Sequence, residues 1–271
     1  MTPAAKRRAM SLLIDDLFSV RGKVVLVTGG SRGIGEMIAR GFVANGARVY
    51  ISSRKADVCE AIATELSAQG ECIAIPADLA RMDEVERLAA DLLDREPKLD
   101  VLVNNAGAAW GEPFDAFAEK GWDRVMDLNV KSLFFLTQKL AGALERAGKH
   151  GDPSRVINIG SIDGLQAPVF GNYSYSASKA AVHQLTRHLA SHLAARNIAV
   201  NAIAPGFFPS KMTEFMMNES PDFADDIPLR RAGSPEDIAG LAIFLASRAG
   251  AYCAGSVVTI DGGLVCAARR R

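Results

Sequence analysis

Short apolar runs alternate with amphipathic segments along most of the chain. The run Lys-Val-Val-Leu-Val-Thr at 23–28 is rich in β-branched residues and leads into a glycine-rich turn, which is typical of a buried strand. Apolar residues then recur at helical spacing across 36–45, and Gly46 closes this segment before a second strand-like run at 48–52. The same alternation predicts strands at 71–76, 101–103, 155–159, 199–203 and 257–260, and helices at 56–68, 82–95, 119–147 and 175–195.

Strands that alternate with helices are typical of an α/β protein whose parallel strands are covered by helices on both faces. We therefore predict a single-domain, Rossmann-like, doubly wound sheet of about seven parallel strands flanked by helices. At 271 residues, 49% of them hydrophobic, the chain is long enough to bury a substantial core. Because no linker or repeat interrupts 21–271, this range is interpreted as one domain and residues 1–20 as an N-terminal extension.

Composition disfavours several classes of partner. Lys and Arg together number 31, as do Asp and Glu, so the net charge is zero and favours neither nucleic acid nor a membrane surface. No apolar run reaches the roughly 18 residues that a membrane helix requires, and the acidic pair Asp15-Asp16 cuts short a weak signal-peptide pattern. The four cysteines lack C-x-x-C spacing. These features favour a cytoplasmic protein with free thiols.

The glycine-rich turn after the first predicted strand has the residue types that bind a pyrophosphate. It reads Thr-Gly-Gly-Ser-Arg-Gly-Ile-Gly across 28–35, and glycines allow backbone N–H groups and a helix N-terminus to approach the ligand closely. The spacing departs from G-x-G-x-x-G, and a simple strand-to-helix turn is the alternative. Its position between the first strand and the first helix favours a dinucleotide site. The residues assigned to this site are Gly29, Ser31, Arg32, Gly33, Ile34 and Gly35.

The residues after the second predicted strand distinguish between the two nicotinamide cofactors. An acidic residue at this position binds the ribose hydroxyls of NAD(H) and repels the 2′-phosphate of NADP(H). This chain has Ser53-Arg54-Lys55 instead, which favours NADP(H). Arg54 is the predicted phosphate ligand, with Ser53 and Arg32 assisting. The alternative is that these cations belong only to the solvated surface.

Several ordered motifs extend from Lys23 to Gly263. They are Thr28 to Gly35, Asp78-Leu79, Asn104-Asn105-Ala106-Gly107, Asn129, Ser161, Tyr175-x-x-x-Lys179, Pro205-Gly206 and Asp261-Gly262-Gly263. Together they resemble the short-chain dehydrogenase/reductase family, and within it the β-ketoacyl reductases of the rhamnolipid-pathway and fatty-acid type. The resemblance implies an NADP(H)-dependent oxidoreductase. It carries further cofactor contacts over to Asp78, Leu79, Asn105, Gly107, Tyr175, Lys179, Pro205 and Gly206.

Carbonyl reduction requires a proton donor at the carbonyl oxygen and a hydrogen bond that polarises the carbonyl. Tyr175 is the predicted acid, and Lys179 lies on the same helical face, where its charge would lower the pKa of the phenol. Ser161 is expected to bond to the substrate oxygen. By resemblance, Lys179 also binds the nicotinamide ribose, and Asn129 holds a water that relays protons to Lys179. Tyr173 is a rival for the acid, but it has no lysine four positions later.

A histidine pair and the helices around it bear on metals and partners. His188 and His192 stand four residues apart on one predicted helix, but no third ligand accompanies them, so no metal site is assigned. The family resemblance implies a homo-oligomer, either a tetramer or a dimer. It would be built through the predicted helices at 119–147 and 175–195.

The segment after Pro205-Gly206 is apolar and bears on the substrate. Its apolar residues are Phe207, Phe208, Met212, Phe215, Met216, Met217 and Phe223. Such a stretch would close over a hydrophobic substrate such as an acyl chain, or would simply pack onto the domain. The interval from Ser161 to Tyr175 is one residue longer than in many members of the resembled family, and the loop that contains Pro168 and Phe170 is expected to absorb the extra residue.

The leading hypothesis is reduction of a β-ketoacyl thioester, carried on acyl carrier protein or coenzyme A, to the β-hydroxyacyl form with NADPH. The alternative substrates are other alcohols or ketones, such as a steroid, sugar, polyol or quinone, since a fold does not determine a substrate. A third hypothesis is a noncatalytic NADP(H) sensor. The intact set of Ser161, Tyr175 and Lys179 disfavours this sensor.

Replacing Arg54 with Ala is expected to weaken NADPH binding selectively, because the guanidinium would contact the 2′-phosphate that NADH lacks. A hydrogen bond to a charged group contributes about 1.5–3 kcal/mol. The ratio of kcat/KM with NADPH to kcat/KM with NADH should therefore fall by about tenfold or more. An unchanged ratio would remove Arg54 from the phosphate site.

Overall fold

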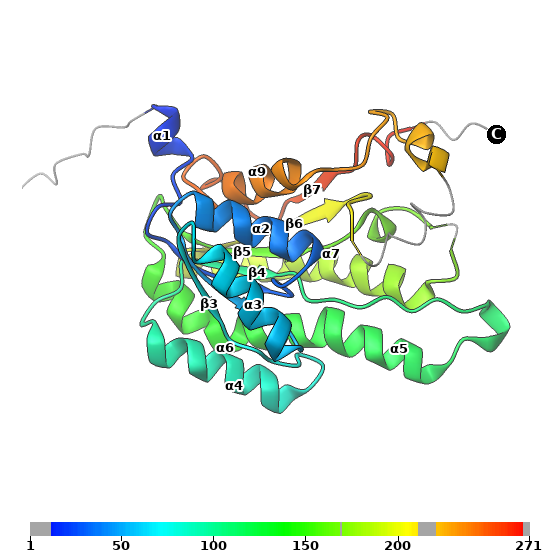
Figure 1. Ribbon diagram of the computed structural model, residues 1–271, viewed down its shortest axis with the longest axis horizontal. Helices are drawn as coiled ribbons and strands as arrows, with labels where there is room; N and C mark the ends of the chain where they lie inside the picture. The colour runs from blue at the N-terminus through cyan, green and yellow to red at the C-terminus, as the bar shows by residue number, and fades with distance from the viewer. Residues whose placement is uncertain (1–11, 169, 211–220, 268–271) are drawn as a thin grey trace, which may run out of the picture.

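One sheet forms the centre of the molecule, and helices cover both of its faces (Figure 1). The computed structural model describes residues 12–168, 170–210 and 221–267, apart from the side chains at 221–223. The strands are β1 (Val24–Thr28), β2 (Arg48–Ser52), β3 (Glu71–Ala74), β4 (Val101–Asn104), β5 (Ser154–Ile159), β6 (Ile198–Pro205) and β7 (Val257–Ile260). The helices are α1 (Ile14–Leu17), α2 (Gly33–Ala44), α3 (Ala56–Leu66), α4 (Met82–Arg95), α5 (Glu119–Met126), α6 (Ser132–Ala147), α7 (Tyr173–Leu193) and α9 (Pro235–Ala246).

All seven strands run parallel, in the order β3-β2-β1-β4-β5-β6-β7. The chain moves outward from β1 to β3 and then crosses to β4 on the other side of β1. In doubly wound sheets a ligand crevice opens at such a reversal, outside the carboxyl ends of the strands. The predicted fold class and the expected seven parallel strands are confirmed.

Two apolar cores lie on opposite faces of the sheet, so the central strands are buried from both sides. Val25 and Val27 of β1 face the core formed with α2, α3 and α9, where Phe42 is among the largest buried side chains. Leu26 points the other way, into the core that includes Leu136 of α6. Alternate strand residues therefore serve different cores. This double burial explains why β1 is a continuous apolar run rather than an alternating one.

The long helix predicted at 119–147 is interrupted by a π-helical turn. α5 ends at Met126, the π turn covers Asp127–Lys131, and α6 begins at Ser132. A π turn inserts a residue into the helical ladder and so changes which side chains face inward. Asn129, within this turn, is 2% exposed. The apolar spacing of the segment contains no sign of the insertion, because the flanking helices keep their own periodicity.

The prediction lacks a helix between the sixth and the last strand, and in this respect it is wrong, because α9 covers Pro235–Ala246. Ser234 is its N-cap, Pro235 occupies the first helical position, and the Asp237 carboxylate accepts a hydrogen bond from Ser234 N at 2.8 Å. These three residues form a helix-start signal that is readable in the sequence. α9 packs against α2 on one face of the sheet (Figure 1).

Buried polar contacts attach two helices to the middle of the sheet. Asn104 Nδ2, at the end of β4, donates to Thr137 Oγ1 of α6 at 3.0 Å and to Asn158 Oδ1 of β5 at 2.9 Å. Asn158 Nδ2 in turn donates to Thr186 Oγ1 of α7 at 2.9 Å. All four residues are buried. Because a buried amide without partners is costly, these contacts restrict how α6 and α7 can slide along the sheet.

The end of the predicted N-terminal extension is attached to the domain. The Leu17 carbonyl accepts a hydrogen bond from Ala249 N at 2.8 Å, the rings of Phe18 and Phe244 are 6.3 Å apart, and Val20 lies in the core. The apolar core therefore includes Val20, the last residue of the predicted extension. Among the described residues, no helix combines the length and the apolar content needed to cross a lipid bilayer.

The contact between α2 and α9 depends on the absence of a side chain at Gly41. A Cβ at Gly41 would lie 2.6 Å from Ala239 Cβ, whereas a Cβ at Gly240 of α9 would meet nothing within 4 Å. We expect Gly41→Ala to lower the free energy of unfolding by about 1–3 kcal/mol through overpacking. Gly240→Ala, the matched control, should raise it by up to about 1 kcal/mol through helix propensity. Urea unfolding measures both values, and shifts of the same sign would contradict this account.

Candidate active site

A cavity of about 390 Å³ lies along the carboxyl ends of the strands. Its wall includes most of the residues predicted for the site, from the turn after β1 to the segment after β6. These are Gly29, Ser31, Arg32, Gly33, Ile34, Ser53, Arg54, Leu79, Asn105, Gly107, Ser161, Tyr175, Lys179, Pro205 and Gly206. Residues far apart in the sequence therefore meet at one edge of the sheet.

The glycine turn takes its shape from backbone conformations that side chains would strain. Gly29 and Gly33 have φ values of +64° and +54°, in the left-handed region that favours glycine. Asn105 holds the turn from the end of β4: its Nδ2 donates to Thr28 O at 2.8 Å and to Gly29 O at 3.2 Å. A Cβ at Gly29 would lie 2.7 Å from the same Nδ2. Contacts within the chain thus hold the shape of the turn.

Two predicted cofactor residues do not line the cavity. A Cβ at Gly35 would lie 2.3 Å from Gly29 O, so Gly35 lets α2 begin directly against the turn rather than facing a ligand. The Asp78 carboxylate accepts a hydrogen bond from Ala80 N at 3.3 Å and is absent from the wall, whereas the adjacent Leu79 is present on it. A direct contact of Gly35 and Asp78 with the cofactor stays a prediction.

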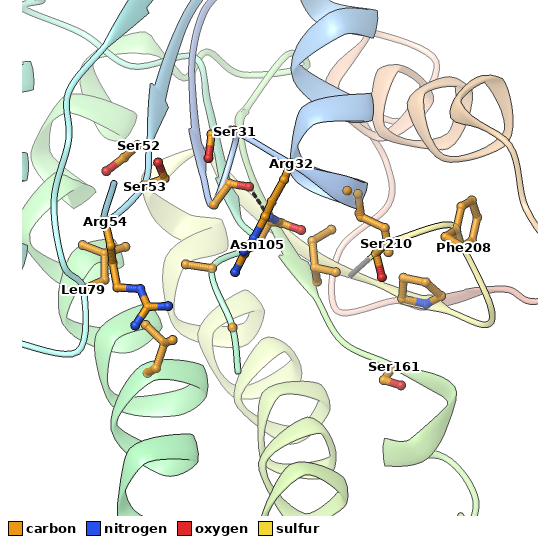
Figure 2. Close-up of a pocket in the computed structure, with 18 of the residues that line it drawn as sticks. Ser31, Arg32, Ser52, Ser53, Arg54, Leu79, Asn105, Ser161, Phe208 and Ser210 are labelled. Carbon is orange, nitrogen blue, oxygen red and sulfur yellow. Dashed lines mark hydrogen bonds between the residues drawn. The ribbon is translucent and has the colours of Figure 1, made fainter. Parts of the chain in front are cut away.

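The charged residues on the cavity wall are all cations: Arg32, Arg54, Lys55 and Lys179. No described Asp or Glu lines it, and the first three cations form no ion pair with another described residue. Arg54 lies at one side of the labelled side chains in Figure 2, and Ser161 lies at the other. The Arg54 end therefore has the charge that a phosphate group requires.

β5 and α7 bring the three predicted catalytic side chains onto one part of the wall. Ser161 follows β5 closely, and Tyr175 and Lys179 occupy successive turns of α7. Lys179 Nζ lies 5.5 Å from the centre of the Tyr175 ring and donates to the Ile159 carbonyl at 2.8 Å. Ser161 Oγ accepts a hydrogen bond from Asp163 N at 3.1 Å.

Burial dominates the ionisation of the tyrosine and the lysine. It raises the pKa of Tyr175 to about 12, opposed by a hydrogen bond with Ser161 and reinforced by the Asp163 carboxylate. It lowers the pKa of Lys179 to about 8, against the attraction of Asp163. The predicted lowering of the phenol pKa is therefore wrong in direction for this structure, because lost hydration disfavours the charged form of each group. At neutral pH a protonated phenol faces an ammonium group.

Asn129 lies behind the catalytic side chains and is absent from the cavity wall. Its Oδ1 accepts a hydrogen bond from Ala108 N at 2.8 Å, and its Nδ2 donates to Ala108 O at 3.0 Å and to Ser178 Oγ at 2.9 Å. The amide thus joins the loop after β4 to α7 one residue before Lys179. This engagement gives the side chain a positioning role, and the water relay through Asn129 stays a prediction.

The loop between Ser161 and Tyr175 is closed by polar contacts of its own. Asn172 Nδ2 donates to Asp163 Oδ2 at 3.0 Å, and Ser176 Oγ donates to the Asp163 carbonyl at 2.8 Å. Asp163 therefore links the start of the loop to the first turn of α7. The longer interval noted in the sequence is accommodated while Ser161 and Tyr175 both stay on the cavity wall.

Several residues on the wall have no counterpart in the sequence-based prediction. Val58 of α3, Leu128 of the π turn and Ser210 after β6 are examples, and such common residue types carry no chemical signature. Phe208, predicted as part of an apolar lid, lines the cavity and packs where a Cβ at Gly233 would lie 2.3 Å from its ring. Met212, Phe215, Met216 and Met217 of that lid, and the side chain of Phe223, lie outside the described residues.

The histidine pair considered as a metal site is a stacked pair on α7. The rings of His188 and His192 meet edge to face with centroids 4.6 Å apart, and His192 Nδ1 lies 3.1 Å from the His188 carbonyl oxygen. In the part of the chain that the structure describes, no group of three His, Cys, Asp or Glu side chains could hold a metal ion. The pair therefore interacts with itself.

A third histidine of α7 lies beneath Ser161. His183 is 2% exposed, and its Nε2 lies 3.5 Å from Ser161 N. Burial lowers the pKa of His183 to about 4; the charges of Lys179 and Arg187 act in the same direction, and the Gly164 backbone opposes them. The imidazole is therefore neutral at physiological pH.

A family comparison accounts for this combination of fold and site. A model of the short chain dehydrogenase family matches residues 23–220. The chain belongs to the short-chain dehydrogenase family. Membership makes it an oxidoreductase, and the resemblance predicted from the ordered motifs is confirmed. The matched range contains the glycine turn, Ser161, and the tyrosine and lysine of α7.

Members of the family with established names are similar to this chain over nearly its full length. A rhamnolipids biosynthesis 3-oxoacyl-[acyl-carrier-protein] reductase of Pseudomonas aeruginosa is 50% identical and covers 91% of this chain and 97% of its own. A 3-oxoacyl-[acyl-carrier-protein] reductase of Synechocystis is 39% identical, with coverage of 91% and 98%. A 2-dehydro-3-deoxy-D-gluconate 5-dehydrogenase of Dickeya dadantii is 36% identical, with coverage of 93% and 98%.

Solved structures of the family share the whole fold. The Pseudomonas aeruginosa protein RhlG, in an NADP active-site complex, has a TM-score of 0.89 and 49% identity, and covers 92% of this chain and 98% of its own. A short-chain type dehydrogenase/reductase from Mycobacterium marinum has a TM-score of 0.86 and 31% identity, with coverage of 93% and 99%. These structures are thus similar to this chain over nearly its whole length, and not only at the glycine turn and α7.

The buried histidine predicts a dependence of stability on acid pH. In the unfolded chain the pKa of His183 returns to about 6.5, so between pH 6.5 and 4 only the unfolded state binds the proton. The free energy of unfolding should therefore fall as the pH is lowered through this window, by up to about 1.4 kcal/mol per pH unit. Urea unfolding of the parent and of His183→Gln across this range isolates the effect, because the other titrating groups cancel in the difference. A pH-independent difference would contradict the buried, neutral imidazole.

Proposed function

We propose that this protein is an NADP(H)-dependent reductase that converts a β-ketoacyl thioester to the β-hydroxyacyl form. The observation that carries the proposal is one cavity wall with cations at one end and a neutral tyrosine beside a serine and a lysine at the other. Full-length relatives named 3-oxoacyl-[acyl-carrier-protein] reductases support this substrate class.

The residues present fit NADP(H). Arg54, with Ser53 and Arg32, would hold the 2′-phosphate at the cationic end. Gly29 and Gly33 leave room for the pyrophosphate beside the start of α2. The remaining predicted cofactor residues on the wall, Asn105, Gly107, Pro205 and Gly206, would border the dinucleotide. When bound, NADPH supplies the hydride that reduces the carbonyl carbon.

Ser161 and Tyr175 would act on the substrate oxygen. The Ser161 hydroxyl, whose oxygen accepts a hydrogen bond from Asp163 N, would donate its own hydrogen to the carbonyl oxygen when the substrate is bound. Tyr175 would then transfer its phenolic proton to that oxygen as negative charge develops there. The raised pKa of Tyr175 keeps the proton in place until this stage. Lys179, which is charged below a pKa of about 8, would stabilise the phenolate that remains.

A sugar-acid dehydrogenase is the second candidate, because the relative from Dickeya dadantii is a gluconate-type dehydrogenase. Phe208 favours an acyl substrate, since it adds a buried aromatic ring to the cavity wall after Pro205-Gly206. The names of the reductase relatives favour acyl carrier protein as the carrier, with coenzyme A as the alternative.

We also propose a cytoplasmic homo-oligomer, either a dimer or a tetramer. A cytoplasmic location fits the use of NADPH and acyl thioesters. The residues of β7 at the edge of the sheet are partly exposed, unlike those of β5 and β6, which are fully buried. A second copy of the chain covering this edge would complete the burial.

The two candidate substrates are separated by initial rates of NADPH oxidation with acetoacetyl-CoA, longer β-ketoacyl carriers, diketones and sugars. The proposal expects the highest kcat/KM with a β-ketoacyl thioester. Turnover confined to sugar-derived carbonyls would favour the second candidate. NADPH binding without turnover of any carbonyl would favour the sensor hypothesis.

Removing the phenolic hydroxyl tests the acid. Tyr175→Phe should lower kcat by about 10²–10⁴-fold, the usual contribution of a general acid. Tyr173→Phe is the matched control, because Tyr173 lies two residues away on the same helix and its ring packs against Phe114 and Phe117. This control should keep near-parental kcat. Equal kcat for Tyr175→Phe and the parent would end the assigned mechanism.

A further inference from the structure

Three ionisable side chains, those of Tyr175, Lys179 and His183, lie along one face of α7. The proposed mechanism uses the tyrosine and the lysine but not the histidine. Tyr175, Lys179 and His183 stand four residues apart, so their side chains lie on successive turns along one side of the helix. Lys179 Nζ donates to Ile159 O at 2.8 Å. His183 Nε2 lies 3.5 Å from Ser161 N. α7 thus contacts the backbone at the end of β5 at two neighbouring points.

The Ser161 N–H lies just beyond the hydrogen bonds of the sheet. Gly160 N, one residue earlier, still donates to the Ile203 carbonyl of β6 at 2.7 Å. Ser161 is buried, and among the described residues the hydrogen-bond partner of its backbone N–H is His183. A buried backbone donor needs a partner, so the acceptor on His183 completes the end of β5.

The chain around Ser161 is fitted closely to the imidazole. A Cβ at Gly160 would lie 2.1 Å from His183 Nε2, and a Cβ at Gly164 would lie 2.8 Å from His183 Cε1. Neither glycine has a positive φ, so backbone conformation does not explain their presence. The space at Gly160 is occupied by His183, and the space at Gly164 is shared by the imidazole and the α7 backbone at Lys179 and Ala180. A side chain at Gly160 would push the imidazole away from Ser161.

The hydrogen bond from Ser161 N also determines the charge and the tautomer of the His183 imidazole. Nε2 can accept the Ser161 N–H only if the imidazole is neutral and carries its proton on Nδ1. Burial favours the neutral form by lowering the pKa of His183 to about 4. The ring also lies close to the Gly164 backbone, which acts against the lowering of this pKa. A buried imidazole needs polar partners that an aliphatic side chain of similar size does not need, so space filling alone does not account for histidine here.

We propose that His183 is a positioning residue for the reduction proposed above, in which its Nε2 accepts the backbone N–H of Ser161 and thereby fixes the Ser161 hydroxyl relative to Tyr175. This inference rests on the proposed function. His183 touches neither the cavity nor the reacting atoms, and it acts through Ser161. Its loss should therefore reduce the rate of the chemical step and leave cofactor binding intact.

Two variants of similar size separate positioning from packing. In His183→Gln the amide oxygen can reach the place of Nε2 and accept the same N–H, whereas His183→Leu fills the space without an acceptor. We expect His183→Leu to lose about tenfold or more in kcat, because small misplacements of catalytic groups are costly. His183→Gln should stay within about threefold of the parent, and both variants should keep KM for NADPH within about twofold.

Equal losses in kcat for the two variants would show that His183 acts only through packing. An unchanged kcat in both variants would show that His183 does not contribute to the reaction. Either result would overturn the proposal. Should His183→Leu fail to fold, His183→Asn replaces it, because its shorter amide reaches only the Nδ1 position and cannot meet Ser161 N. The same tenfold loss is then expected. An Asn variant as active as His183→Gln would overturn the proposal.

The tautomer supplies a readout that needs no substrate. In protein labelled with ¹⁵N-histidine, the signals of His183 are those lost in His183→Gln. At pH 7 we expect a protonated Nδ1 and a bare Nε2; a proton on Nε2 would overturn the proposed hydrogen bond. If the parent reduces no β-ketoacyl thioester, the proposed function fails while this result still stands. The kinetic comparison is then made with the carbonyl that the parent does reduce.

Discussion

The site depends on one constraint, which is that all strands of the sheet run in the same direction. Their carboxyl ends therefore open onto a single edge, where β1 leads to the glycine turn, β2 to Ser53 and Arg54, and β5 to Ser161. Lys179 extends this arrangement to α7, because its ammonium is hydrogen bonded to the last carbonyl of β5. A reversed β5 would carry Ser161 to the opposite edge and separate it from Tyr175.

Directional contacts, added to apolar packing, determine how the helices are placed on this sheet. Apolar burial holds α6 and α7 against the sheet but tolerates sliding, since the hydrophobic effect has no preferred direction. The buried amides of Asn104 and Asn158 remove this freedom through their bonds to one threonine on each helix. Asn129 adds a further contact to α7 beside Lys179. The catalytic side chains are thus placed by polar contacts that take no part in the chemistry.

The cavity combines two electrostatic environments. Arg32, Arg54 and Lys55 are exposed cations on its wall, where an anionic ligand can reach them. Elsewhere on the wall burial raises the pKa of Tyr175 and lowers that of Lys179, so proton transfer there responds to charge that develops on a bound substrate. One ligand that carries a phosphate at one end and a reactive ring at the other matches this division.

The order of strands and helices, the motifs and the cationic residues after β2 were all determined by the sequence itself, because periodicity and residue type are local properties of the chain. The start of α9 was equally readable in its capping residues. Only the tertiary structure decided that Asn129 lies behind the site, that a π turn places it there, and that His183 lies under Ser161. It also reversed the expected shift in the pKa of Tyr175. These outcomes depend on which distant segments exclude water from a side chain, and neither residue type nor spacing contains that information.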